Sequence, residues 1–323
     1  MKPITKKPAT EPRTSKELSV AFSGHETFVF RYGWLKKAVD AVTERTDAFS
    51  SDDAMVDLGV GKNMVRSIRH WALATRILEE STGTRGAHLS CTALGKVLFG
   101  SQGLDPYLED INSLWLLHWN LVSNERRSTS WSWAFNLLSD NEFTRESLTS
   151  LITDELQRRG AKLPSSNSLG RDIDCFIRTY AVPRDKKTLV LEDSLDCPLV
   201  ELQLVEEDVA PGLFYFRRGE QNTLANELFV YALLDFWDRT APNRETLAFA
   251  DIAYGFGSPG SSFKLDENSI AERLDSLERT TEGSLQYADT AGLKQVYRRG
   301  ALEPLRFLNS YFERVETSVL RGA

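Results

Sequence analysis

Apolar side chains recur at helical spacing along most of this 323-residue chain, which predicts a mainly α-helical fold. Over 32–44, for example, Trp34, Leu35 and Ala38 fall on one face of a predicted helix. Further helices are predicted at 54–58, 62–75, 92–99, 108–124, 143–159, 169–180, 224–239, 247–254 and 268–280. Short strands are predicted at 77–79, 88–90, 189–191, 199–204 and 214–216, with a hairpin-like pair over 285–298. The pattern therefore indicates an α-rich fold with small β wings.

The order of two helices followed by a short hairpin occurs near both ends of the chain, which favours a multi-domain winged helix-turn-helix architecture. The length is consistent with two or three domains. We expect a disordered basic arm at 1–17, an N-terminal winged-helix DNA-binding domain at 18–104, a central helical domain at 105–240 and a C-terminal winged-helix-like domain at 241–323.

The net charge of −7 hides an asymmetry along the chain. Residues 1–90 carry 14 Lys and Arg against 11 Asp and Glu, whereas residues 91–323 carry 25 against 35. The stretch from Lys62 to Leu78 contains four cations, one histidine and no acid. Because local charge decides where a phosphate backbone can lie, this stretch favours a nucleic-acid partner in spite of the acidic average.

The chain shows no apolar run long enough to span a bilayer, and its first 20 residues lack the apolar region of a secretory signal. The three cysteines, Cys91, Cys175 and Cys197, lie far apart without metal-ligand spacing. We therefore expect a cytoplasmic protein with reduced thiols and no membrane partner.

The segment 58–71 has the pattern of a recognition helix. Gly59 and Gly61 supply a tight turn, and the helix that follows is apolar on one face and cationic on the other. Predicted contacts to DNA from this helix are Lys62, Asn63, Arg66 and Arg69. The hairpin that follows would add two more, Arg85 and His88. The alternative is a winged helix used for protein–protein packing, with solvated cations.

The segment 22–37 combines a histidine, a carboxylate and several cations with aromatic residues. His25 could act as a general base or metal ligand, Glu26 as a metal ligand, and Arg31 or Lys36 could steady a scissile phosphate. We therefore treat these four as candidate catalytic residues. The alternative is a buried Glu26–Arg31 ion pair, with His25 bonded to the backbone.

Other candidates are weaker. The candidate ligands for a divalent metal such as Mg²⁺ are Glu26, Asp105, Glu109 and Asp110, although Asp105 also fits a helix cap. His118, between two tryptophans, fits a core histidine, and the 258–262 loop with Lys264 fits either a phosphate-binding turn or a β-turn. No P-loop or dinucleotide fingerprint is present, so we expect no nucleotide or organic cofactor.

Five motifs together resemble one bacterial family. They are FSGHETF with RYGWLKK at 22–37, LGVGKNMV at 58–65, DPYLED with LWLLHW at 105–119, PLVEL at 198–202 and SPG with FKLDE at 258–267. The chain is similar over about 22–298 to the SspB family of DNA phosphorothioation and phage defence, formerly a domain of unknown function.

The resemblance implies DNA binding and a DNA-nicking activity that opens the backbone for sulfur incorporation. It also implies three companions: a cysteine desulfurase, an ATP-using sulfur-transfer enzyme and an ATPase. The residues alone also allow a non-catalytic winged-helix adaptor or transcriptional regulator, or a scaffold for the sulfur-transfer proteins.

Overall fold

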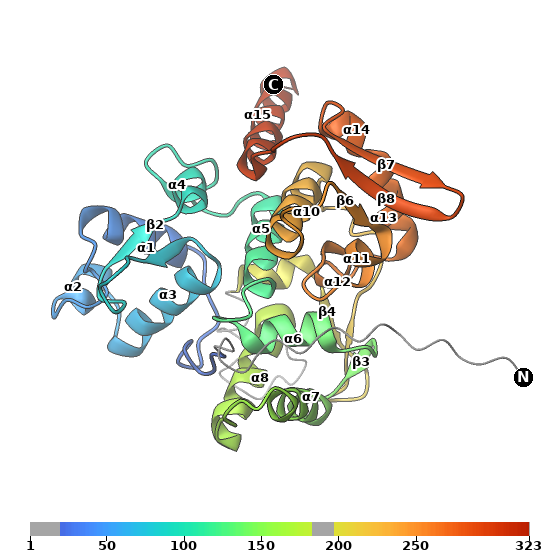
Figure 1. Ribbon diagram of the computed structural model, residues 1–323. Coiled ribbons are helices and arrows are strands. Elements are labelled where there is room, and N and C mark those ends of the chain that lie inside the picture. The colour runs from blue at the N-terminus through green and yellow to red at the C-terminus, as the bar shows by residue number, and fades with distance from the viewer. Residues whose placement is uncertain (1–19, 183–196, 323) are drawn as a thin grey trace, which may run out of the picture.

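The computed structural model describes residues 20–182 and 197–322, so the predicted arm at 1–17 and strand at 189–191 lie outside the described residues. The N-terminal module lies on the left of Figure 1. It contains α1 (Trp34–Glu44), α2 (Ala54–Leu58), α3 (Lys62–Ala74), the antiparallel pair β1 (Leu78–Glu80) and β2 (Leu89–Cys91), and α4 (Ala93–Phe99). These elements match the predicted ones within one or two residues.

The described residues of the central part form four α-helices, a short 3₁₀ helix and a three-stranded sheet. The helices are α5 (Ile111–Val122), α6 (Thr129–Leu137), α7 (Arg145–Arg158) and α8 (Ser166–Tyr180). The antiparallel sheet has the order β3-β5-β4, with β3 (Glu142–Phe143), β4 (Val205–Glu207) and β5 (Phe214–Phe216).

The strand predicted at 199–204 is wrong, because Pro198–Leu202 forms the 3₁₀ helix η1. Proline at the first helical position loses no hydrogen bond there and has its φ already set for a helical turn. The apolar residues of this turn are buried as a strand's would be, which explains why the pattern was misleading.

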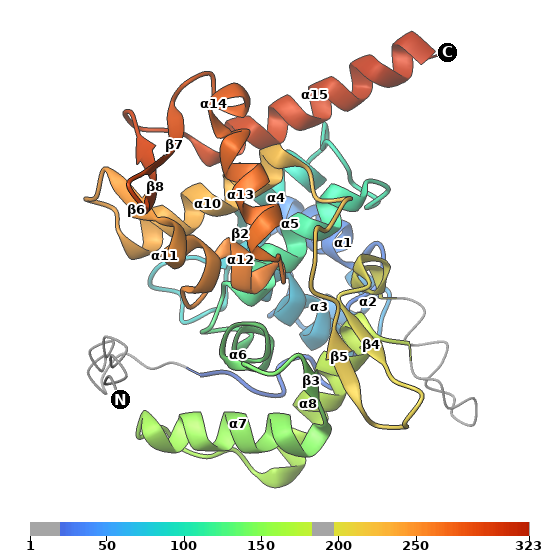
Figure 2. The ribbon, with the colours of Figure 1, turned by 90° about the vertical axis from the view of Figure 1, so that its right-hand side faces the viewer.

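The C-terminal part begins with α10 (Asn226–Thr240) and continues through a second three-stranded antiparallel sheet, β6-β8-β7. Its elements are β6 (Thr246–Ala248), α11 (Phe249–Tyr254), α12 (Pro259–Ser262), α13 (Glu267–Asp275), α14 (Leu277–Thr280), β7 (Leu285–Thr290) and β8 (Leu293–Arg298). The last helix, α15 (Pro304–Gly322), was not predicted; it packs on α10 and its far end projects from the body (Figure 2).

The centre of the molecule is α5, whose side chains from Asn112 to Val122 are all buried. Trp115 and Trp119 on α5 are joined in the core by Trp131 and Trp133 of α6, which are at most 1% exposed. One apolar cluster extends from Val29 to Phe312. The protein is therefore mainly α with small antiparallel sheets, and no helix in the described ranges is long and apolar enough to cross a membrane.

Two polar contacts join the end of α3 to the central helices. Asn124 donates from Nδ2 to the carbonyls of Leu73 and Ala74, at 3.2 and 2.9 Å, and so satisfies acceptors that a helix C-terminus leaves open. Arg76 donates to the Ser123 carbonyl at 2.9 Å. Because these bonds hold its C-terminal end, α3 has a defined orientation relative to the rest of the molecule.

Candidate functional site

The turn between α2 and α3 is made by the two glycines identified in the sequence. Gly59 ends α2 in the left-handed conformation, with φ 62°, and its N–H bonds back to Met55 and Val56 carbonyls. Gly61 is extended and precedes the first residue of α3. Leu58 and Val65 pack together across this turn. The short connection therefore sets α3 at a defined angle to α2.

The exposed and buried faces of α3 are separated as the sequence predicts. Ile68 and Trp71 are fully buried, whereas Lys62 and Asn63 are exposed and the Arg66 side chain is 54% exposed. This helix runs along the surface of the N-terminal module in Figure 1. One face of α3 thus presents two cations and an amide to solvent from its first two turns.

Arg69 has a different role from its neighbours. Its Nη2 donates to Glu80 Oε1 at 2.9 Å and to the Gly86 carbonyl at 3.1 Å, which ties α3 to the β1–β2 hairpin. Arg127, from the loop before α6, contacts the other Glu80 oxygen at 2.8 Å. Partial burial by itself raises the pKa of Glu80, but the two guanidinium groups outweigh it and hold that pKa below its usual value.

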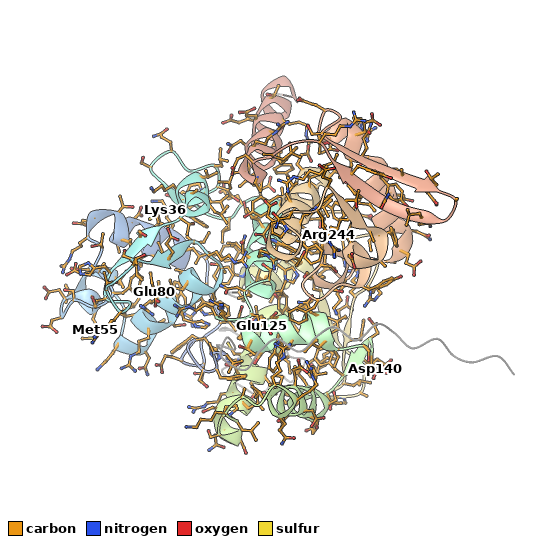
Figure 3. The ribbon with its side chains drawn as sticks, in the orientation of Figure 1. Lys36, Met55, Glu80, Glu125, Asp140 and Arg244 are labelled. Carbon is orange, nitrogen blue, oxygen red and sulfur yellow. The ribbon has the colours of Figure 1, made fainter. Side chains whose placement is uncertain are left out.

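The hairpin loop carries the two remaining predicted contacts. Arg85 is exposed and has a φ of 51°. His88 is exposed, and its Nδ1 lies 2.8 Å from the Thr46 hydroxyl. Since Arg69 holds the Gly86 carbonyl against α3, the backbone next to Arg85 lies close to this helix. The fold therefore gathers these candidates on one module, shown with Glu80 and Met55 labelled in Figure 3.

His25 is fully buried and both of its ring nitrogens are engaged. Its Nδ1 accepts the Thr27 backbone N–H at 3.0 Å, so the ring hydrogen lies on Nε2, which donates to Asp172 Oδ1 at 2.8 Å. Asp172 also accepts the Ser23 N–H at 2.6 Å and the Ser130 hydroxyl. In this arrangement His25 positions the 22–28 segment against α8 and α6.

Asp172 is not among the predicted site residues, although one signal in the sequence pointed to it. It occupies a position of the apolar stripe of α8, three residues after Leu169 and four before Phe176, where a solvated acid is unexpected. Its side chain is 1% exposed. A carboxylate on a buried stripe requires donors, and these come from a segment about 150 residues earlier.

The backbone around His25 is strained. Ser23, Glu26 and Thr27 have φ values of 61°, 50° and 71°, in the left-handed region that non-glycine residues rarely adopt. Each such residue costs on the order of 1–3 kcal/mol and persists only where surrounding contacts determine it. Arg178 supplies one such contact, donating to the Thr27 carbonyl at 2.6 Å.

The other candidate catalytic residues do not converge on His25. Glu26 Oε1 lies 3.2 Å from Nη1 of Arg66, so the ion partner of Glu26 is on α3. The guanidinium of Arg31 lies over the Trp34 ring at 5.8 Å. Lys36 pairs with Asp40 on α1 at 2.5 Å, and Figure 3 shows it on a different side of the module from Met55. The catalytic assignments stay predictions.

The acidic residues proposed for a metal have other partners. Asp105 accepts the Glu109 and Asp110 backbone N–H groups, at 2.8 and 3.1 Å, and Asp110 caps α5 by accepting the Asn112 N–H at 2.7 Å. Glu109 is exposed. Within 20–182 and 197–322 no three His, Cys, Asp or Glu side chains are grouped to hold a metal ion. These donors therefore do not fit a preformed metal centre.

Two further candidates belong to the core. His118 is held between the Tyr180 hydroxyl at 2.8 Å and the Ser262 carbonyl at 2.9 Å, and burial lowers its pKa to about 3. Lys264 is 1% exposed and donates to the Phe135 carbonyl at 2.6 Å, while Ser258 caps α12. Because Ser258 and Lys264 are both buried, the 258–264 segment does not form an open phosphate-binding turn.

Comparison with known proteins identifies the family of this chain. The family model described as a protein of unknown function, DUF4007, matches residues 22–312. Two solved structures are similar: an SspB crystal structure and a magnesium ion-bound SspB crystal structure. Each is 32% identical, with a TM-score of 0.81 over 91% of this chain and 88% of the other. No curated protein sequence matches. On the length of the family match and the likeness to SspB, the chain belongs to the DUF4007 family and to the family of SspB.

Proposed function

We propose that this protein binds duplex DNA through α3, as the DNA-binding component of a bacterial phosphorothioation system. The observation that carries the proposal is the exposed face of α3, where Lys62, Asn63 and Arg66 project from the first two turns. A helix that enters the major groove contacts bases from its N-terminal turns, and its cations neutralise phosphates. The likeness to SspB supports the choice of system.

The N-terminal module has the element order of a winged helix-turn-helix. After α1, the Thr46 carbonyl accepts the Leu89 N–H at 2.8 Å, so this short segment adds to the β1–β2 pair as a first strand would. Then follow α2, α3 and the hairpin. In this arrangement α3 is the recognition helix and the hairpin loop with Arg85 is the wing.

The C-terminal part repeats the same order with opposite charge. The elements α10, β6, α11, α13, β7 and β8 occur in this order, with the short helices α12 and α14 before and after α13, and the sheet order is β6-β8-β7. The helix equivalent to α3 is α13, whose exposed side chains include Glu267, Glu272 and Asp275. Carboxylates repel a phosphate backbone. We therefore assign DNA binding to the N-terminal module alone.

Each predicted contact has a distinct role in the proposal. Asn63 and Arg66 reach base edges, because they lie three residues apart near the start of α3. Lys62 and Arg85 contact phosphates, and His88 lies near the sugar–phosphate edge. Arg69 positions the wing through Glu80 and Gly86. In the SspB-type system, a cysteine desulfurase, an ATP-using sulfur-transfer enzyme and an ATPase would act on the DNA held here.

Fluorescence anisotropy with a labelled duplex tests the proposal directly. We expect the full-length protein to bind the duplex at low salt, with an affinity that decreases as salt is added. Absence of binding at low salt would exclude α3 as a DNA-binding helix. In that case the winged-helix arrangement serves protein–protein packing.

DNA nicking is the second candidate function. The observation that favours it is the similar SspB structure determined with magnesium ion. Supercoiled plasmid incubated with the pure protein should become relaxed when Mg²⁺ is supplied and stay supercoiled when EDTA replaces it. Plasmid that stays supercoiled in Mg²⁺ would leave DNA binding as the function of this chain alone.

A further inference from the structure

The strained segment Ser23–Thr27 lies directly against the recognition helix. In Figure 1 the blue chain that follows the grey N-terminal trace passes between α3 and α8. Beneath it, His25 and the Ser23 N–H bond to Asp172, and Arg178 holds the Thr27 carbonyl. These contacts determine the left-handed backbone at Glu26, the residue whose carboxylate contacts α3.

The segment presents Glu26 to Arg66 on the solvent side of α3. Oε1 of Glu26 lies 3.2 Å from Nη1 of Arg66, and the two side chains are 32% and 54% exposed. The contact uses Nη1, and a guanidinium has five N–H donors in all. Arg66 is therefore oriented by the Glu26 carboxylate while keeping donors for another partner.

A carboxylate at this place needs an explanation, because it opposes the attraction of a phosphate backbone. An exposed ion pair contributes little to stability, so it does not offset a left-handed backbone at Glu26 and Thr27. A strained residue fixed beside a predicted base-contacting arginine points instead to a function in recognition.

The donors of Arg66 and the acceptors of Glu26 match the hydrogen-bonding pattern that one base pair presents in the major groove. In the major groove a G·C pair presents two adjacent acceptors, guanine O6 and N7, and one donor, the cytosine N4 amino group. Arginine donates to both acceptors, and a glutamate accepts from the amino group. We infer that Glu26 and Arg66 together recognise a G·C base pair, with Glu26 also orienting the guanidinium. This inference rests on the proposed DNA binding by α3.

Holding the arginine in place also gives the contacts of this segment a function. A free arginine side chain loses rotamer freedom when it binds a base, and orientation before binding reduces that loss. The sequence separates the two groups by 40 residues, and the His25–Asp172 contact brings them together. Glu26 is thereby a specificity-determining residue, and His25 is a positioning residue.

Selection from a randomised duplex library, followed by sequencing, tests the inference. The wild-type protein should enrich duplexes with G·C at one position, by about 5- to 150-fold over other pairs. Glu26→Gln and Arg66→Lys should each reduce that preference toward unity. Glu26→Ala should bind random duplex more tightly than wild type while losing the preference, because a repelling charge is removed.

The exposed pair Arg145–Asp174, at 2.6 Å, is the matched control. Arg145→Lys and Asp174→Asn change the same kinds of group on α7 and α8, outside the exposed face of α3, and both should keep the wild-type preference. The inference is overturned if Glu26→Gln and Arg66→Lys keep the G·C preference, or if the wild-type protein binds DNA without any G·C preference. In both cases the proposed DNA binding by α3 is unaffected. If the wild-type protein binds no duplex, the proposed function fails and the inference fails with it.

Discussion

Removing the two exposed cations assigned to phosphates should flatten the salt dependence of DNA binding. The variant is Lys62→Ala with Arg85→Ala. Neither residue is held in an ion pair with another described side chain, and both are exposed, so the substitutions leave the fold intact. Arg69 is excluded from the variant because it holds the hairpin through Glu80 and Gly86.

The magnitude follows from the number of contacts removed. Each phosphate neutralised on duplex DNA contributes about 0.9 to the slope of log affinity against log salt. Two contacts therefore account for about 1.8 of the slope. Between about 50 and 200 mM salt the wild-type protein should lose roughly tenfold more affinity than the variant does.

The assay is fluorescence anisotropy with one labelled duplex across a salt series. A second double variant, Arg145→Ala with Arg279→Ala, removes the same charge from exposed positions of α7 and α14. It controls for the change in net charge and should keep the wild-type slope. The reasoning is refuted if the Lys62/Arg85 variant keeps the wild-type slope, or if the control flattens it equally.

Two further predictions concern stability. Asp172→Ala removes a buried acceptor of three hydrogen bonds and should lower the free energy of unfolding in urea by about 3–5 kcal/mol, with faster amide exchange over 23–27. The control is Asp174→Ala on the same helix, where the side chain is 49% exposed, and this variant should change the free energy of unfolding by less than about 0.5 kcal/mol. Equal losses in the two variants would contradict the role of Asp172. Burial lowers the pKa of His118 from 6.5 to about 3, so the unfolded chain binds the extra proton between these values. His118 should therefore contribute a loss of about 1.4 kcal/mol of stability per pH unit as the pH decreases from 6.5. His118→Asn should have a slope shallower by that amount in urea unfolding, and an unchanged slope would contradict the assignment.

Local patterns in the sequence were sufficient for most of the secondary structure. Helical periodicity predicted α1 to α3, α7 and α8 within a few residues, because each buries one continuous stripe. Several elements were missed, among them α15, for which the sequence analysis made no prediction. The helix α6, with Ser and Trp alternating, has no clear stripe because nearly every side chain is buried, and η1 is too short for periodicity to distinguish it from a strand.

The candidate site, too, could be predicted only where it depends on residues close together in the chain. The two faces of α3 follow from spacing within thirteen residues, so Lys62, Asn63 and Arg66 could be identified without a structure. The contacts of the segment 22–37 could not be predicted from spacing. Its aromatic and ionisable residues suggested a local catalytic group, yet His25 pairs with Asp172 and Glu26 with Arg66. Those partners are 147 and 40 residues away.

The sequence by itself determined the apolar and cationic faces of α3, the glycine turn before it and the hairpin after it, because these depend on residues close together in the chain. Only the tertiary structure decided that His25 is buried, that Arg69 holds the wing and that Glu26 faces Arg66. Buried polar groups must find partners wherever the fold supplies them. A pairing across 147 residues depends on how α3, α6 and α8 pack together, and no local pattern encodes that packing.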